Sequence, residues 1–434
     1  MMTYAEALAW LETFTNTERS GRFLWEGETS LVRERALLAR LGNPQQAYGI
    51  THVAGTKGKG STSALVAAIL HAAGICTGLY TQPELHTLRE RIRAGQQLIS
   101  EDEMARLLSQ VREALTGMDA SLGPFITYEL VTALALLFFR EAGARHAVIE
   151  VGLGGRLDAT NVIEPMVSVI TSISYDHMQV LGNTLTEIAG EKAGIIKPGV
   201  PVVCSALAPE AVAVIKRRCE EQGAPLLRVG PENTPDCQYT YRDRGTDGKR
   251  QWFEIITPTK RYRNLELALL GAHQLENATA AVAVAEVLRV RRLPVNTLAI
   301  RRGLRQVRWP GRLQVVRWQP LLVVDGAHNA DSFAHLFAAL RRHFEFERLL
   351  LVLGVMADKD MSGITAEIVH AGVNRVVVTG AAHPRAAVPD ALAGWLASAG
   401  QREVTICADV TAALRLALDE ARPRDLVCVA GSLY

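Results

Sequence analysis

Short apolar runs rich in β-branched residues alternate with longer segments of helical periodicity through the first half of the chain. This alternation is typical of a parallel sheet whose faces are covered by helices. Gly74 and Gly143 come within two residues after the ends of two predicted helices, where the backbone of a helix C-terminus favours glycine. Thr184 and Glu187 have capping-box spacing and predict a further helix start. Strands are predicted at 50–54, 76–80, 147–151, 166–171 and 201–204, and helices at 61–73 and 127–141.

The pattern changes in the middle of the chain and then resumes. The polar and aromatic stretch 238–257, which contains Gly245 and Gly248, predicts a β-hairpin. An Ala-rich helix is expected at 275–290, and the turn at Pro310-Gly311 marks a domain boundary. We therefore predict two domains, 1–307 and 308–434, the second of them a smaller α/β unit. Its strands are predicted at 321–324, 349–353, 375–379, 404–407 and 426–429.

Composition narrows the classes of function. The 434 residues carry a net charge of +2, which gives no electrostatic basis for a nucleic-acid partner or a membrane surface. The six cysteines include no CxxC pair, so zinc is not indicated. The N-terminus predicts a helix capped by Thr3 and Glu6 rather than a signal peptide, and no apolar run is long enough to span a membrane. We expect a cytoplasmic monomer.

A glycine-rich loop between a predicted strand and a predicted helix is the strongest local signal. It reads Gly55-Thr56-Lys57-Gly58-Lys59-Gly60-Ser61-Thr62. The glycines let backbone amides approach phosphate oxygens, and the N-terminus of the next helix favours anions. Lys59 is expected to reach the outer phosphates, and a hydroxyl of Ser61 or Thr62 to coordinate Mg²⁺. Because Gly60 separates Lys59 from Ser61, the strict pattern G-x-x-x-x-G-K-[ST] is not met.

Three further positions carry groups suited to a metal site. Glu150 ends an apolar strand and Asp176-His177 follows another, which is where parallel sheets collect ligands. Each has a plain alternative as a solvated residue at a strand end or turn. Lys192 is expected on a helix, where partial burial would lower its pKa and CO₂ would convert the amine into a carbamate able to ligate Mg²⁺. The plain alternative for Lys192 is an ion pair.

Eight blocks of sequence, taken in order, resemble folylpolyglutamate synthases and, more loosely, all Mur ligases. In that family a glycine after the loop lysine is ordinary, so Gly60 favours the family over other phosphate-loop NTPases. The resemblance runs from about residue 31 to the last residue. The blocks are 52–61, 150–161, 176–182, 191–199, 273–277, 310–312, 325–329 and 431–434.

The resemblance implies both an architecture and a reaction. The fold would be α/β, with a Mur-ligase-like ATP-binding parallel-sheet domain followed by a smaller, Rossmann-like glutamate-ligase domain. The reaction would be ATP-dependent ligation of L-glutamate to the carboxylate of a folate or of dihydropteroate, through an acyl phosphate. Two Mg²⁺ ions would assist it.

The resemblance also implies residue roles. Lys59, Lys192 and His328 would be catalytic. Pro83, Asp158 and Ala159 would contact the pterin, and His328 the glutamate or the transferred phosphoryl group. Mg²⁺ would be held by Ser61, Glu150, His177 and a carbamylated Lys192. The nucleotide would lie on Gly55, Thr56, Gly58, Lys59, Gly60, Ser61, Thr62, Asn277, Arg312 and Asp325.

One loop departs from the family. Gln82-Pro83-Glu84-Leu85 stands where Ser-Pro-His-Leu is usual. A serine hydroxyl binds Mg²⁺ directly, whereas Gln82 offers only an amide oxygen. Glu84 adds a negative charge beside an acceptor that itself carries carboxylates. The loop therefore leaves open a Mur-type ligase with a different carboxylate acceptor, or a catalytically idle nucleotide-binding protein.

Overall fold

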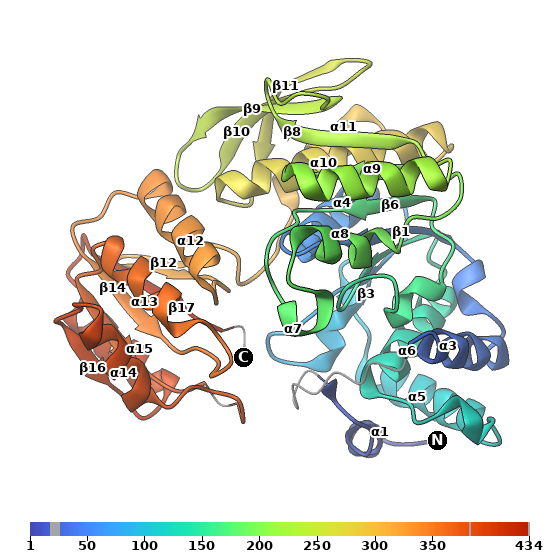
Figure 1. The fold of residues 1–434 in the computed structure, drawn as a ribbon, viewed down its shortest axis with the longest axis horizontal. Coiled ribbons are helices and arrows are strands. Elements are labelled where there is room, and N and C mark those ends of the chain that lie inside the picture. Colours follow the sequence, from blue (N-terminus) through green and yellow to red (C-terminus); the bar gives the residue numbers. More distant parts are fainter. Residues whose placement is uncertain (18–26, 382, 433–434) are drawn as a thin grey trace. The chain divides into compact units, whose positions relative to one another are not determined.

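The computed structural model describes residues 1–17, 27–381 and 383–432. It contains two compact units (Figure 1). The first unit comprises Met1–Arg244, Trp252–Leu267 and His273–Val307, and the second comprises Gly245–Gln251, Ala268–Ala272 and Arg308–Tyr434. The last two residues of the block 431–434 lie outside the described part of the chain. The functional division at 307–308 stays a prediction.

The first unit is built on a sheet whose described strands run in the order β11-β10-β9-β8-β7-β6-β1-β5-β2-β3-β4. β1 (Gly49–Ala54) lies between β5 (His146–Glu150) and β6 (Val167–Ile170) and is parallel to both. These strands are buried along almost their whole length, as expected of parallel strands covered on both faces. The other strands are β2 (Thr77–Tyr80), β3 (Ile92–Ala94), β4 (Gln97–Leu98), β7 (Val202–Cys204), β8 (Leu226–Pro231), β9 (Tyr239–Thr246), β10 (Gln251–Ile256) and β11 (Arg261–Leu267).

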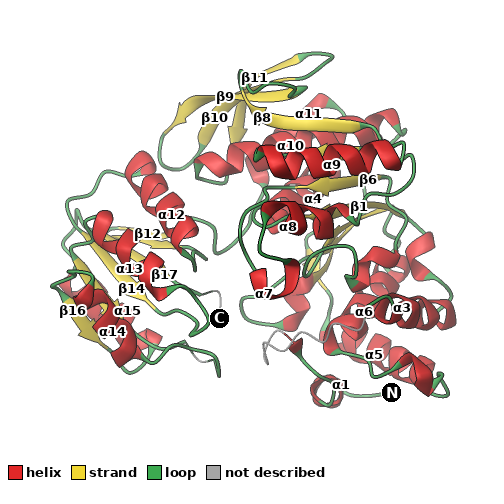
Figure 2. Cartoon of the chain, in the orientation of Figure 1, coloured by secondary structure: helices red, strands yellow, loops and turns green. Residues whose placement is uncertain are grey.

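Helices lie against this sheet (Figure 2). They pack on it through separate hydrophobic cores. One core joins Ile50 and Ile149 of the sheet to α1 (Tyr4–Glu12), α3 (Thr29–Arg40), α5 (Glu101–Leu115) and α6 (Thr127–Glu141). Another joins Ile170 and Val202 to α8 (Leu185–Ala193) and α9 (Pro209–Glu221). The remaining helical segments are η1 (Pro44–Gln46), α4 (Lys59–Ala72), η2 (Leu88–Arg91), η3 (Ala120–Leu122), η4 (Ala159–Val162), α7 (Met178–Leu181), α10 (Ala272–Val290) and α11 (Thr297–Gln306).

The second unit has its own sheet, whose described strands run in the order β12-β13-β17-β14-β15-β16. All its pairings are parallel except that of the edge strand β12 (Gln314–Trp318) with β13 (Leu321–Val324). The central strands β14 (Leu349–Leu353) and β17 (Leu426–Ala430) are almost entirely buried. The other elements are β15 (Arg375–Val378), β16 (Val404–Ile406), α12 (Ala330–His343), α13 (Met361–His370), α14 (Pro389–Ser398) and α15 (Val410–Glu420).

The predicted α/β class is confirmed, and most predicted elements lie within two residues of the observed ones. The strands Leu321–Val324 and Leu349–Leu353 and the helix Thr127–Glu141 match residue for residue. The hairpin of β9 and β10 and the two capping boxes are also present. In the ranges that the structure describes, each helix is too short or too polar to cross a lipid bilayer.

Glu34 on α3 is a carboxyl group in an unusual environment. It is fully buried, and neither of its oxygens has a hydrogen-bond partner. Burial, reinforced by nearby Glu129, raises the pKa of Glu34 well above 4.5. The folded protein therefore holds this carboxyl protonated, and the folded state loses stability as the pH rises above the value at which the carboxyl ionises in the unfolded chain.

Replacing Glu34 by methionine should therefore stabilise the protein, by on the order of 1–3 kcal/mol. The gain should increase over the pH range above about 4.3, the ordinary pKa of a glutamate, because there the unfolded chain ionises this group first. Thermal unfolding across this range measures it, with the exposed Glu113→Met as the control. A stability difference that does not change with pH would contradict the interpretation.

Candidate active site

The glycine-rich loop 55–62 connects β1 to α4, and the backbone geometry requires glycine at two of its positions. Gly55 has φ +146°, and a Cβ there would lie 1.8 Å from Thr171 Oγ1. Gly58 has φ +85°, and a Cβ there would lie 2.4 Å from Asn277 Oδ1. Both conformations are ones that side chains rarely adopt. The loop is therefore closely packed against its neighbours and has no space for larger residues.

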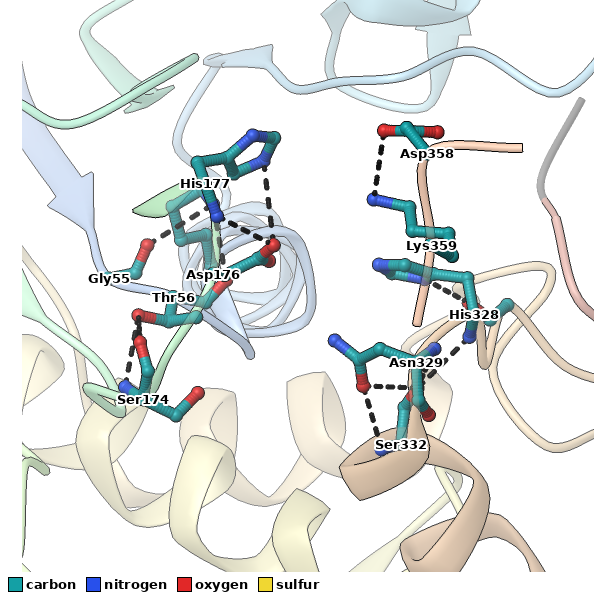
Figure 3. Close-up of polar contacts among 12 residues, drawn as sticks. Gly55, Thr56, Ser174, Asp176, His177, His328, Asn329, Ser332, Asp358 and Lys359 are labelled. Carbon is teal, nitrogen blue, oxygen red and sulfur yellow. Dashed lines mark hydrogen bonds and ion pairs between the residues drawn. The ribbon is translucent and has the colours of Figure 1, made fainter. Parts of the chain in front are cut away.

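The segment after β6 fixes the loop in place. The Thr56 amide donates to Ser172 O at 2.7 Å, and the Thr171 hydroxyl donates to Lys57 O at 2.7 Å. Thr56 Oγ1 also donates to Ser174 O and accepts from Ser174 N (Figure 3). These contacts cross between the carboxyl ends of neighbouring strands, where ligands of parallel sheets bind.

Two lysines meet at the carbonyl of Gly55. Lys59 Nζ donates to Gly55 O at 3.2 Å and to Thr56 O at 3.4 Å. Lys192 Nζ, which comes from α8, donates to Gly55 O at 2.8 Å. Burial, together with the charge of Lys59, lowers the pKa of Lys192 to about 7. The buried side chain of Lys192 thus reaches from α8 to a backbone carbonyl of the glycine-rich loop.

The first turn of α4 is joined to α10 by a chain of side-chain hydrogen bonds. Gln274 Nε2 donates to Ser61 Oγ at 3.3 Å, and Asn277 Nδ2 donates to Gln274 Oε1 at 3.0 Å. Thr62 Oγ1 donates to Asn277 Oδ1 at 3.3 Å. The candidate residues Ser61, Thr62 and Asn277 therefore lie together, and Gln274 joins them although the sequence analysis gave it no role.

The candidate metal ligands supply mainly oxygens. Glu150 is buried at the end of β5, and its Oε2 accepts the Gln82 amide at 3.2 Å. His177 is about half-exposed, and its backbone amide donates to Asp176 Oδ1 at 3.0 Å (Figure 3). Within the described ranges, no three His, Cys, Asp or Glu side chains gather as a metal cage. Ser61 and Glu150 fit a Mg²⁺ that arrives with a nucleotide, because Mg²⁺ needs only one or two protein carboxylates beside phosphate oxygens.

Asp158 holds together the loop that follows β5. Its Oδ2 accepts the amides of Gly152 and Leu153 at 2.9 and 3.0 Å. Its Oδ1 accepts from the Tyr128 hydroxyl at 3.0 Å and from both the amide and the hydroxyl of Thr160. Burial raises the pKa of Asp158, while these hydrogen bonds oppose the shift. Asp158 and its neighbour Ala159 are both buried, so the Asp158 carboxylate shapes the loop from within.

The second unit brings its candidate residues to the carboxyl edge of its sheet. Asp325 accepts the amides of Leu313 and Ala327 at 2.7 and 2.8 Å, and burial raises its pKa against the opposing charge of Arg312. His328 Nδ1 lies 2.7 Å from Gly326 O. Because a carbonyl only accepts, Nδ1 carries a proton.

Lys359 Nζ lies 3.7 Å from the carboxylate of Asp358 (Figure 3). Arg385 NH1 lies 3.5 Å from the same carboxylate. Neither cation was among the residues predicted from the sequence. The charged run Asp358-Lys359-Asp360, which follows the predicted strand 349–353, could have indicated that Lys359 lies at the carboxyl edge of this sheet.

The comparisons with known proteins cover most of the chain. A model of the Mur ligase middle domain matches residues 53–285, and a model of the Mur ligase glutamate ligase domain matches residues 311–433. The dihydrofolate synthase/folylpolyglutamate synthase of Bacillus subtilis is 37% identical over 359 residues, which are 82% of this chain and 80% of the relative.

This chain belongs to the Mur ligase family.

Solved structures place the chain more closely within the Mur ligases. The Mycobacterium tuberculosis folylpolyglutamate synthase complexed with ADP has a TM-score of 0.88 and 31% identity, and the match covers 99% of this chain and 96% of that one. An FPGS–AMPPCP–folate complex has a TM-score of 0.83 and 33% identity, with coverages of 100% and 97%. The resemblance to folylpolyglutamate synthases is therefore confirmed, while the individual residue roles stay predictions.

Proposed function

We propose that this Mur ligase joins the amine of L-glutamate to the carboxylate of a folate, with cleavage of ATP. Both catalytic domain types of the family are matched, and relatives over nearly the full length are named folylpolyglutamate or dihydrofolate synthases. Those names also favour dihydropteroate as a second acceptor. The observation that carries the proposal is the glycine loop of β1 and α4, with two lysines on the Gly55 carbonyl.

The nucleotide phosphates are proposed to lie on the loop amides from Gly55 to Thr62. Lys59 begins α4, so its side chain and the first amides of the helix attract the same anion. A phosphate would compete with the carbonyls of Gly55 and Thr56 for the Lys59 ammonium. Asn277 lies against Gly58 and Thr62, within reach of the same ligand. Arg312 and Asp325 are proposed as nucleotide ligands only because the resemblance to folylpolyglutamate synthases implies it.

Mg²⁺ is proposed to be held by Ser61 and Glu150, with His177 and a carbamylated Lys192 as further ligands. Mg²⁺ would screen the phosphate charge and favour loss of the outer phosphoryl group. The lowered pKa of Lys192 supports the carbamate, because only an uncharged amine attacks CO₂. The carbamate would convert a buried cation into an oxygen ligand.

The reaction proposed has two steps. The acceptor carboxylate attacks the outer phosphoryl group of ATP. ADP departs, and the acceptor is converted into an acyl phosphate. The amine of glutamate then attacks the acyl carbon, and phosphate leaves from the tetrahedral intermediate. The protein contributes chiefly positioning and a fixed set of charges. Asp158, Ala159 and Pro83 are assigned to the acceptor, and His328 to the glutamate or the phosphoryl group.

Phosphate release from ATP tests this function. We expect release to require L-glutamate together with a folate or dihydropteroate, and the product to carry one more glutamyl residue by mass spectrometry. Phosphate release that occurs only with a carboxylate acceptor other than a folate or dihydropteroate would indicate a different Mur-type ligase. ATP binding without release under any of these conditions would indicate an idle nucleotide-binding protein. Either result would reject the proposal.

A reducing, cytoplasmic compartment is proposed on the chemistry of the cysteines. All six are free, and Cys204, Cys219 and Cys428 are buried. Burial raises the pKa of Cys219 to about 11 and of Cys204 to about 12, which keeps these thiols protonated and unreactive. That the protein is a monomer stays a prediction.

A further inference from the structure

The loop after β2 carries the two residues that depart from the family, Gln82 and Glu84. Glu84 forms an ion pair with Arg91, whose side chain is only 6% exposed. The Thr81 amide also donates to Arg91 O at 3.0 Å, so Arg91 is bonded at both its ends to this loop. The negative charge that the sequence analysis placed beside the acceptor is therefore compensated within the loop itself.

Gln82 bonds in two directions from the same position. Its backbone amide donates to Glu150 Oε2 at 3.2 Å, and its side-chain Nε2 donates to the Tyr128 hydroxyl at 3.4 Å. The packing around it is close, because a Cβ on Gly152 would lie 2.9 Å from Gln82 Nε2 and 2.8 Å from the Tyr128 hydroxyl. The Gln82 amide group is thus directed at Tyr128 and Gly152.

The Tyr128 hydroxyl has a single possible arrangement of its hydrogen bonds. It accepts from Gln82 Nε2 and from the Gly152 amide, the latter at 3.0 Å, so its own proton must go to Asp158 Oδ1. Tyr80 stacks against the Tyr128 ring at 6.4 Å between centroids and limits its tilt. Gln82 is therefore joined to Asp158 through the Tyr128 hydroxyl, and Asp158 in turn binds the amides of the loop 152–160.

We propose that Gln82 is a positioning residue for the folate-type acceptor, acting through Tyr128 and Asp158, and not a ligand of Mg²⁺. The serine that is usual in the family would be too short to reach the Tyr128 hydroxyl. Glutamine in its place therefore gives up a metal-ligating hydroxyl and gains a hydrogen bond that positions the acceptor loop. The inference deepens the proposed function and rests on it, because loop 152–160 is the segment assigned to the acceptor.

The test separates acceptor binding from the use of Mg²⁺. Gln82→Ala, Gln82→Ser and Tyr128→Phe are compared with wild type, with the exposed Gln96→Ala as the matched control. Calorimetry without nucleotide or Mg²⁺ gives the dissociation constant of a folate. Steady-state ATP cleavage gives the Mg²⁺ concentration for half-maximal activity. Circular dichroism verifies that each variant is folded.

We expect Gln82→Ala and Gln82→Ser to bind the folate roughly threefold to tenfold more weakly, the effect of one lost hydrogen bond. Tyr128→Phe should bind it at least as weakly, because the Tyr128 hydroxyl makes three hydrogen bonds. The double variant Gln82→Ala/Tyr128→Phe should bind no more weakly than the worse single variant, because the two residues act in series. The Mg²⁺ requirement should not change in Gln82→Ala or Tyr128→Phe, neither of which gains or loses a Mg²⁺ ligand. A raised Mg²⁺ requirement with unchanged folate binding, or additive losses in the double variant, would overturn the proposal. A wild-type protein that neither binds folate nor cleaves ATP would instead reject the proposed function.

Discussion

Replacing Lys192 by methionine is expected to lower ligase turnover by about two orders of magnitude or more, while ATP still binds. The replacement keeps the volume of a buried side chain but removes the amine that lies 2.8 Å from Gly55 O. The phosphate-binding amides and Lys59 remain in place, so the nucleotide keeps most of its contacts. Turnover is measured by phosphate release, and binding by calorimetry with a non-hydrolysable ATP analogue.

The carbamate is tested on the same pair of proteins. Carbon NMR of wild type in isotopically labelled bicarbonate should give a carbamate signal that the methionine variant lacks. The exposed Lys216→Met on α9 serves as the control and should retain both signal and turnover. Full turnover in the Lys192 variant, or an NMR signal that survives the replacement, would show that the carbamate assignment is wrong.

Replacing Arg33 by methionine is expected to destabilise the first unit by about 3–5 kcal/mol, because it leaves a carboxylate buried without its cation. Arg33 NH2 lies 2.6 Å from Glu129 Oε1, and Arg33 Nε donates to Oε2 at 3.2 Å. Both side chains are at most 2% exposed. Arg33 also donates to Leu122 O and stacks on Phe125, so its loss removes contacts from α3, α6 and the segment between α5 and α6.

Denaturant unfolding measures this effect, with the exposed Arg35→Met on the same helix as the control. The double variant Arg33→Met/Glu129→Met should recover part of the lost stability, since neither charge is then left unpaired. A loss below about 1 kcal/mol for Arg33→Met would contradict the account, because that is the range of a solvent-exposed pair.

The sequence predicted the elements whose signals are local. The strand before Gly55, the Thr184 capping box and the helix Thr127–Glu141 are each specified by adjacent residues. The short strands β3 and β4 and the strands β8, β11 and β12 were missed. β3 and β4 are only three and two residues long and pair with each other across a two-residue turn, so neither is long enough to show an alternating pattern.

The site was predictable as a set of motifs but not as a set of contacts. The loop glycines and Lys59 follow from chemistry that one segment carries. Tyr128 and Asp158 are 30 positions apart in the chain, and Arg33 and Glu129 are 96 apart, so no local pattern links them. Glu84 shows the same limit, because its charge alone indicated repulsion of the acceptor, whereas its pairing with Arg91 removes that repulsion.

The central claim is that ATP activates an acceptor carboxylate for attack by glutamate. It is tested most directly with a folate whose terminal carboxylates carry a heavy-oxygen label. Activation through an acyl phosphate predicts that the phosphate released with each new amide bond contains one labelled oxygen taken from the folate. Released phosphate without label, or release that does not depend on the folate and glutamate together, would contradict the account.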